Sequence, residues 1–237
     1  MRSSLTFLFI LVLGISTSYG QNGAKISGRV VYEGPQVEMK YLTVTTDDPV
    51  CSGTEIPDET LIVDPQYGGL KNAVVYLDGL QAQEGWQPES EPIIDQVGCT
   101  FTPHVVILPL GQSLKIRNSD GILHNFHTSS EHNRPVNLAM PKTQTELEIP
   151  GRRFRRPDFI NTKCDVHGWM SGVIVVAEHP FYVLTDDQGE FELNDVPPGA
   201  YNLVVWHESL AGNAQTITVN IEGANDLKIV LRPANTD

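Results

Sequence analysis

The chain has 237 residues, a formal net charge of −13 and 40 % hydrophobic residues. An acidic balance of this size excludes binding to nucleic acid through bulk charge, because both partners are negative. The length suits one large domain or two small ones.

The first twenty residues, 1–20, have the features of a secretory signal peptide. Arg2 gives a positive start, and residues 5–15 form an apolar run that is too short to cross a bilayer comfortably. Small residues precede Gln21, where we place the cleavage; the alternative is an uncleaved anchor. No other stretch has the length and apolar character of a membrane span. The mature chain is therefore expected to be exported, either periplasmic or secreted, with no membrane span.

Short apolar or alternating runs, separated by Gly, Pro, Asn and Asp, are typical of β-strands. They are residues 25–32, 41–46, 61–64, 73–79, 104–110, 113–118, 145–149, 158–162, 172–178, 181–186, 190–193, 201–207, 215–220 and 227–231. Residues 80–92 and 121–143 are predicted as long polar loops, the second with room for a short helix. This pattern predicts an all-β protein built from sandwiches or barrels.

The tail from Phe181 resembles the carboxypeptidase regulatory-like β-sandwich, which has an Ig- or transthyretin-like fold. The match is a T-D-x-x-G-x-F turn followed by P-G-x-Y, formed by Thr185, Asp186, Gly189, Phe191, Pro198, Gly199 and Tyr201. Residues 26–34 and 70–79 fit the two opening strands that this resemblance implies. We therefore predict one split sandwich, residues 21–80 plus 181–237, into which residues 81–180 are inserted. Two consecutive domains are the alternative.

The predicted insert carries a candidate metal site. Cys164, His167 and Met170 stand three residues apart on a short loop before a strand, and His124 follows a separate strand. A thiolate, two imidazoles and a weak axial thioether are the ligands of a blue-copper electron-transfer site. Zinc also accepts cysteine and histidine, but it gains little from a thioether, so Met170 favours copper.

These residues resemble the cupredoxins, the family of plastocyanin, azurin and amicyanin, over residues 93–178. The resemblance implies a Greek-key β-sandwich with His124, Cys164, His167 and Met170 as ligands of one type 1 copper ion. It also implies that Asn125 ties the two ligand loops together by hydrogen bonding. A degenerate cupredoxin that never loads metal is the alternative.

The three cysteines are an odd number for an exported chain, which favours disulfides. We expect a disulfide between Cys51 and Cys99 and a metal-bound thiolate at Cys164. The alternative is that all three are reduced and buried.

Further residues are candidates for contacts beyond the metal. Trp169, between two predicted ligands, is either a partner contact or a packing residue. The arginines of the run 151–158 either dock an acidic redox partner or pair with the acidic faces of the protein itself. They are Arg152, Arg153, Arg155 and Arg156. The remaining histidines are expected to be solvated, packed or, for the first, close to the site without ligating: His127, His104, His132, His179 and His207.

The sequence therefore predicts an exported type 1 copper protein that passes single electrons between redox protein partners and is not an enzyme. The alternative is a non-redox exported binding module whose cupredoxin domain stores, senses or delivers copper, or is degenerate.

Overall fold

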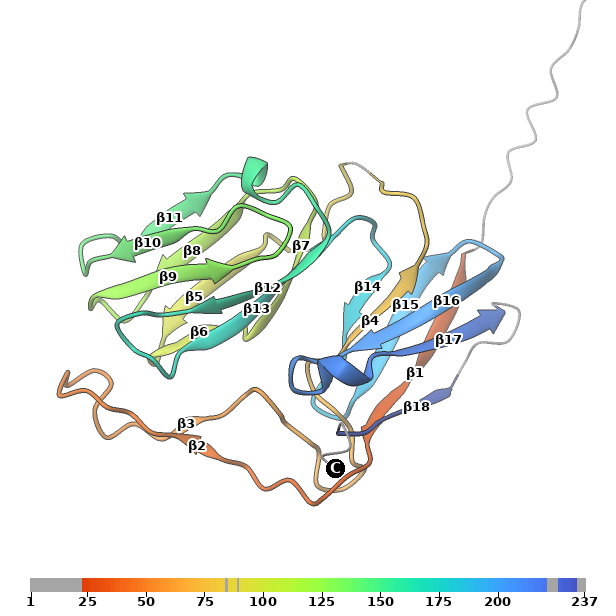
Figure 1. The fold of residues 1–237 in the computed structure, drawn as a ribbon, viewed down its shortest axis with the longest axis horizontal. Helices are drawn as coiled ribbons and strands as arrows, with labels where there is room; N and C mark the ends of the chain where they lie inside the picture. The colour runs from red at the N-terminus through yellow and green to blue at the C-terminus, as the bar shows by residue number, and fades with distance from the viewer. Residues whose placement is uncertain (1–22, 84, 89, 221–225, 234–237) are drawn as a thin grey trace, which may run out of the picture.

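The computed structural model describes residues 23–83, 85–88, 90–220 and 226–233. The prediction of an all-β protein is confirmed, because the described elements are strands with two short 3-10 helices (Figure 1). Within these ranges, no helix has the length and apolar character needed to cross a membrane. The predicted signal peptide lies outside the described residues.

Strands β5 to β13 form one sandwich of two sheets, the β5–β13 sandwich. The larger sheet has the order β10-β9-β12-β13-β7, and the smaller has the order β11-β8-β5-β6. The elements are β5 (Ile93–Val97), β6 (Thr100–Thr102), β7 (Val105–Pro109), β8 (Leu114–Asn118), β9 (His124–Ser129), β10 (Asn137–Met140), β11 (Glu146–Ile149), η1 (Gly151–Arg153), β12 (Asp158–Lys163) and β13 (Ser171–Ala177). Alternate side chains such as Leu114 and Ile116 fill the core between the sheets, as period-2 patterning predicts.

The remaining long strands form a second sandwich. Its sheets have the orders β15-β1-β18 and β14-β4-β16-β17. The elements are β1 (Ala24–Tyr32), β4 (Val74–Asp78), β14 (Tyr182–Leu184), β15 (Glu190–Val196), β16 (Ala200–Trp206), η2 (Glu208–Asn213), β17 (Gln215–Asn220) and β18 (Leu227–Leu231). Its core joins residues far apart in sequence, such as Ile26, Leu77 and Leu203. Strands β1 and β4 thus pair with strands that follow β13.

The two sandwiches share an apolar contact. Val74 of β4 packs in one cluster with Val105 of β7 and with Val173 and Val175 of β13. Strand β13 is consequently buried along almost its whole length, which explains why its sequence is a continuous apolar run rather than an alternating one. The ring of His104 also pairs with Glu208 across this contact.

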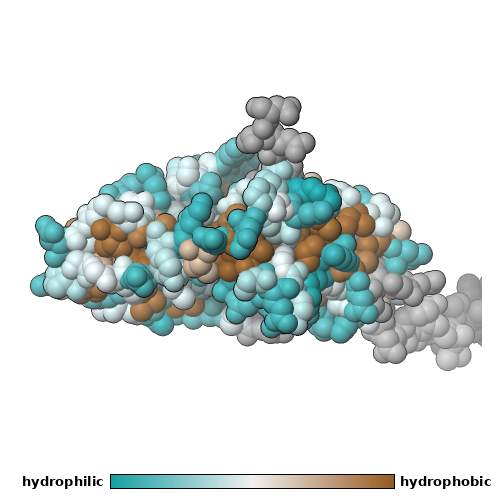
Figure 2. All heavy atoms as spheres, turned by 90° about the horizontal axis from the view of Figure 1, so that it is seen from below, coloured by the Kyte–Doolittle hydropathy of each residue, from teal (hydrophilic) through white to brown (hydrophobic). Residues whose placement is uncertain are grey.

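A segment between β1 and β4 runs beneath the β5–β13 sandwich as a strap, residues 41–57 (Figure 1). It holds the short strands β2 (Tyr41–Leu42) and β3 (Ile56–Pro57), which pair with each other. The predicted disulfide is confirmed: Cys51 of the strap is bonded to Cys99, in the turn between β5 and β6. Figure 2 views the molecule from this lower side and shows apolar patches separated by hydrophilic residues.

Several sequence predictions of secondary structure are wrong: the strand expected over residues 41–46 is limited to β2, and strands β5 and β6 were not expected. Residues 121–143 hold β9 and β10 instead of a loop with a short helix, and β9 lies inside the five-stranded sheet. Its polar side chains hide the strand from an apolar pattern, because His124 and Asn125 are buried for other reasons. Residues 61–64 form only an isolated bridge, from Val63 to Leu70, because Leu61 and Val63 pack on the second core as part of a loop.

Candidate metal centre

Strand pairing brings the predicted ligands to one end of the five-stranded sheet. Strand β12 runs antiparallel to β9 and places Lys163 opposite His127. Continuing this register, Cys164 emerges beside the beginning of β9, where His124 is the first residue. The loop after Cys164 then returns into β13, which pairs with the other edge of β12. His124 and the Cys164 loop therefore meet although forty residues separate them.

Three donor atoms converge at this end. His124, Cys164 and His167 each offer one atom, and these atoms lie within 4.8 Å of one another. The two histidine Nδ1 atoms are 3.0 Å apart, and the Cys164 Sγ lies 3.9 Å from the His167 Nδ1. An ion bonded at about 2.0 Å to nitrogen and about 2.3 Å to sulfur spans such separations. The residues therefore fit a single metal ion held by two imidazoles and a thiolate.

The ligand loop is closed by its own backbone. The N–H of Cys164 donates to the carbonyl of Met170 at 3.2 Å, and the N–H of Met170 donates to the carbonyl of His167 at 2.9 Å. The N–H of His167 donates to the Cys164 sulfur at 3.3 Å. Met170 is buried in the same core cluster as Cys164. The predicted axial residue thus faces the core of the sandwich, not solvent.

Asp120 holds the imidazole of His124 from behind. The His124 Nε2 lies 2.9 Å from a carboxylate oxygen of Asp120, which leaves the Nδ1 facing the other donors. The carboxylate also accepts the backbone N–H groups of Gly98 at 2.7 Å and Cys99 at 2.9 Å. Asp120 is not among the residues predicted from the sequence; an acidic side chain four positions before a candidate ligand is the signal that points to it.

Asn125 links the two ligand segments. Its side-chain oxygen accepts the N–H of Asp165, the residue after Cys164, at 2.8 Å, and its amide donates to Asn137 of β10. Asp165 also pairs with the Nδ1 of His127 at 2.9 Å. His127 therefore braces the loop from outside, and its ring lies outside the group of converging donors.

Without a metal, the electrostatics of the site favour a thiolate at Cys164 next to a protonated imidazolium at His124. Burial lowers the pKa of His124, but the hydrogen bonds to Asp120 and to Cys164 outweigh it and raise that pKa to about 9. Burial raises the pKa of Cys164, but the hydrogen bond with His124 and the surrounding backbone N–H groups bring it below its usual value. Burial, followed by the charge of His124, lowers the pKa of His167. A deprotonated sulfur is the form that binds a metal.

The strap covers one side of this centre. Trp169 donates its indole N–H to the carbonyl of Cys99 at 3.1 Å, and its ring lies 5.1 Å from the ring of His167. Trp169 also packs with Ile56 and the disulfide in one apolar cluster. His124, Cys164 and His167 are 0 %, 1 % and 4 % exposed, so water reaches the donors poorly.

Three of the other histidines are packed and one is exposed. His104 pairs with Glu208, and the backbone N–H of Phe181 donates to His179. His207 is buried: its Nε2 faces the carbonyl of Lys71, while its Nδ1 accepts the N–H of Ser209. Burial, which is the largest cause, lowers the pKa of His207 to about 4. His132 lies in the exposed loop after β9.

The structure does not bring Trp169 and the arginine run together. Arg155 and Arg156 precede β12, whereas Cys164 follows the other end of the same strand. Figure 1 shows η1 at the top of the β5–β13 sandwich and the turn between β12 and β13 at its lower end. The arginines and Trp169 therefore belong to opposite ends of one sandwich and do not form one partner surface.

Comparison with known proteins gives partial matches. No curated protein matches the chain. The family model of Polysaccharide lyase family 4, domain II, matches residues 154–227. This range includes most of the tail in which the sequence suggested a carboxypeptidase regulatory-like sandwich, and that resemblance stays a prediction.

Several solved structures are similar to part of the chain. The Cu-containing nitrite reductase (NirK) from Thermus scotoductus SA-01 is 19 % identical with a TM-score of 0.34, over 42 % of this chain and 26 % of that chain. A Cu(I) mutant of amicyanin is 14 % identical with a TM-score of 0.32, over 44 % of this chain and 98 % of that chain. The novel purple cupredoxin from Nitrosopumilus maritimus is 17 % identical with a TM-score of 0.31, over 37 % of this chain and all of that chain.

Proposed function

We propose that this protein holds one copper ion at His124, Cys164, His167 and Met170 and passes single electrons between redox partners. The observation that carries the proposal is the convergence of one sulfur and two imidazole nitrogens within 4.8 Å. When bound, the copper supplies a one-electron couple between Cu(II) and Cu(I). The chain supplies three converging donors, a buried setting and a buried thioether in the core cluster that contains the sulfur ligand.

Copper is preferred to zinc because of the donor set. Zinc favours four tetrahedral nitrogen, sulfur or oxygen ligands, and the thioether of Met170 adds little for it. Two imidazoles and one thiolate with a weak thioether are the set that copper uses for electron transfer. The burial of Met170 in the core cluster that contains Cys164 supports this assignment.

Burial of the donors supports a carrier role over copper delivery or catalysis. A delivery protein must release its ion, and an enzyme must leave an open position for its substrate. Here the donors are almost fully buried, and backbone hydrogen bonds close the ligand loop. A fixed site lowers the rearrangement that accompanies a change of charge, which suits electron transfer.

We place the redox partner over the open side of the site. Leu123 and Val166 directly precede His124 and His167, and their side chains are 49 % and 47 % exposed. Large exposed apolar side chains beside a functional group are typical of contact surfaces. The partner is a redox protein of unknown identity. The disulfide supports an oxidising location, so we propose that the mature chain is periplasmic or secreted.

The test is copper loading of the mature chain. Cu(II) is added to the wild type, to Cys164→Ser and to His124→Gln, and visible and EPR spectra are recorded. We expect intense visible absorption from thiolate–Cu(II) charge transfer in the wild type and its loss in both variants. His127→Gln is the matched control, because His127 is close to the site but binds Asp165 instead; it should keep the spectrum.

Two results would contradict the proposal. One is a colourless wild type that takes zinc in preference to copper. The other is an unchanged spectrum in Cys164→Ser, because the sulfur would then not be a ligand. A coloured protein that exchanges its copper rapidly with a chelator would favour storage or delivery over electron transfer.

A further inference from the structure

Five arginine side chains line one hollow at the end of the β5–β13 sandwich that is farthest from the metal centre. The hollow has a volume of about 540 Å³. Its cationic residues, which we call the arginine cradle, are Arg134, Arg152, Arg153, Arg155 and Arg156. Four belong to the run noted in the sequence, and Arg134 joins them from the loop between β9 and β10.

The backbone of the cradle is held in place before any ligand arrives. The side-chain oxygen of Asn133 accepts the N–H groups of Arg155 at 2.8 Å and Arg156 at 3.0 Å, and its amide donates to the Arg156 carbonyl at 2.9 Å. Phe154 is buried in the sandwich core between the two pairs of arginines. This anchoring directs the arginines on either side of it outward, so a ligand meets a surface that is largely preorganised.

The charges of the cradle are unpaired. Among the residues that the structure describes, none of the five arginines forms an ion pair, although the chain carries a net charge of −13. The neighbouring carboxylate of Asp158 is occupied by the Ser130 hydroxyl, the His132 N–H and the Asn133 amide. Among the described residues, the structure therefore shows no pairing of these arginines with acidic side chains of the protein itself.

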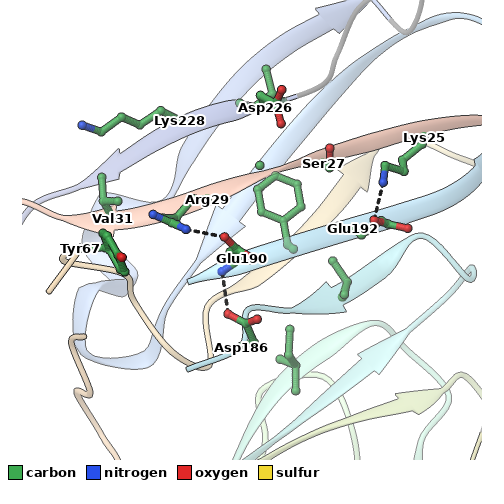
Figure 3. Close-up of a pocket in the computed structure, with 15 residues that line it drawn as sticks. Lys25, Ser27, Arg29, Val31, Tyr67, Asp186, Glu190, Glu192, Asp226 and Lys228 are labelled. Carbon is green, nitrogen blue, oxygen red and sulfur yellow. Dashed lines mark hydrogen bonds and ion pairs between the residues drawn. The ribbon is translucent and has the colours of Figure 1, made fainter. Parts of the chain in front are cut away.

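A second hollow also contains cations, but most of them are paired with acidic side chains. It lies along β1 and β15 and has a volume of about 780 Å³ (Figure 3). There Lys25 pairs with Glu192 and Arg29 with Glu190. Two of its three cations are thus neutralised within the protein, and only Lys228 has no ion pair among the described residues, whereas all five arginines of the cradle lack one. Clustered like charges repel each other, so an external anion relieves an unfavourable arrangement.

The arginine cradle lies far from the metal centre. Strand β12 has six residues, and the cradle and the metal ligands lie at its two ends. At about 3.3 Å per residue this strand is roughly 20 Å long. A molecule bound in the cradle is therefore anchored to the protein without covering the metal centre.

The chemistry of the lining selects the ligand. Guanidinium groups are planar forks that bind carboxylate and phosphate oxygens in pairs, and a sulfate group offers the same arrangement of oxygens. Apart from the arginines, the described residues that line the hollow are His132 and Asn133, so it has no apolar side chain for the centre of a protein interface and none of the large aromatic side chains Phe, Tyr or Trp on which nucleic-acid bases stack best. We propose that the arginine cradle binds an acidic polysaccharide, through carboxylate or sulfate groups spaced along one strand.

The test uses the mature protein without added metal, so its outcome is independent of the copper proposal. Binding to fluorescently labelled polygalacturonate and heparin is measured by anisotropy at several salt concentrations, with neutral dextran as the uncharged polymer. The variant Arg152→Ala/Arg155→Ala is compared with Arg117→Ala/Arg232→Ala. The control also removes two exposed cations, but from sites paired with acids elsewhere.

We expect the wild type to bind at least one acidic polysaccharide, with affinity falling as salt rises. Removing Arg152 and Arg155 should weaken binding by at least about tenfold and reduce the salt dependence, because hydrogen bonds to charged groups are strong. The affinity of Arg152→Lys/Arg155→Lys should lie between those of the wild type and the double alanine variant, because lysine keeps the positive charge and loses the forked guanidinium group. The Arg117/Arg232 control should bind as the wild type does.

The proposal fails if neither polysaccharide binds at low salt, or if the cradle variant binds as tightly as the wild type. It also fails if polyglutamate or a single-stranded DNA oligonucleotide binds through the same arginines more tightly than both polysaccharides. The occupant would then be an acidic peptide or a nucleic acid. Circular dichroism of each variant checks that the fold is retained; Arg152 and Arg155 are exposed, so it should be.

Discussion

Removing the Cys51–Cys99 disulfide should release the strap and lower the stability of the protein. The bond joins residues separated by 48 positions. In the chain-entropy description, a cross-link that closes a loop of this length reduces the entropy of the unfolded chain enough to contribute about 4 kcal/mol. The double variant Cys51→Ser/Cys99→Ser should therefore lose about 4 kcal/mol of unfolding free energy. Both cysteines must be replaced, because one free thiol would compete for the metal.

The assay is urea unfolding followed by circular dichroism, combined with hydrogen–deuterium exchange of the strap. Exchange of residues 41–57 should increase more than exchange of β13, because the strap depends on a small apolar cluster around Ile56 and the disulfide. Wild type treated with a mild reductant is the matched control, since it opens the same bond without changing the sequence. A loss below about 1 kcal/mol, or an unchanged exchange pattern in the strap, would refute this reasoning.

Two further predictions concern single residues. In the unfolded chain His207 takes up a proton near its ordinary pKa of 6.5, whereas in the folded chain it does so only near about 4. The contribution of His207 to the free energy of unfolding is therefore complete above pH 6.5 and falls as the pH decreases below that value. Wild type should lose about 2 kcal/mol more than His207→Gln between about pH 7 and pH 5, measured by urea unfolding; equal losses would show that His207 is not held neutral. Gly151→Ala should destabilise the protein by about 1–3 kcal/mol, because the added Cβ would fall 1.8 Å from the Gly111 carbonyl oxygen. Gly168→Ala is the matched control in thermal melts, since nothing lies within 4 Å of its Cβ position; equal melting temperatures for the two variants would contradict the packing seen around η1.

Strands whose burial follows a simple pattern are predictable from sequence, and those buried for other reasons are not. The runs around β8 and β13 are visible because their apolar residues alternate or run together. Strand β9 is not predicted by such a pattern, because its buried residues include polar ones. His124 is buried as a candidate metal ligand, and Asn125 is buried as a hydrogen-bonding side chain. Period-2 patterning detects apolar burial and carries no signal for buried polar groups that find partners.

The residues of the metal centre also fall into those that the sequence reveals and those that only the structure reveals. The spacing of Cys164, His167 and Met170 is local, so the sequence displays it directly. The support of His124 by Asp120 also lies within one loop, but the backbone N–H groups that fix Asp120 come from the β5–β6 turn. Arg134 likewise joins the arginine cradle from another loop. Contacts made by tertiary pairing leave no periodic trace in one sequence.

The pairing of β1 has a consequence for synthesis. Its sheet partners are β15 and β18, so both β1 and β4 leave the ribosome before the strands that they pair with. The β5–β13 sandwich has its own core and can form first, whereas β1 and β4 stay unpaired until β14 to β18 have been synthesised. A nascent chain stopped before β14 would therefore present two strands, β1 and β4, with both edges unpaired, and such edges are templates for aggregation. The second sandwich can therefore close only after β14 to β18 have been synthesised.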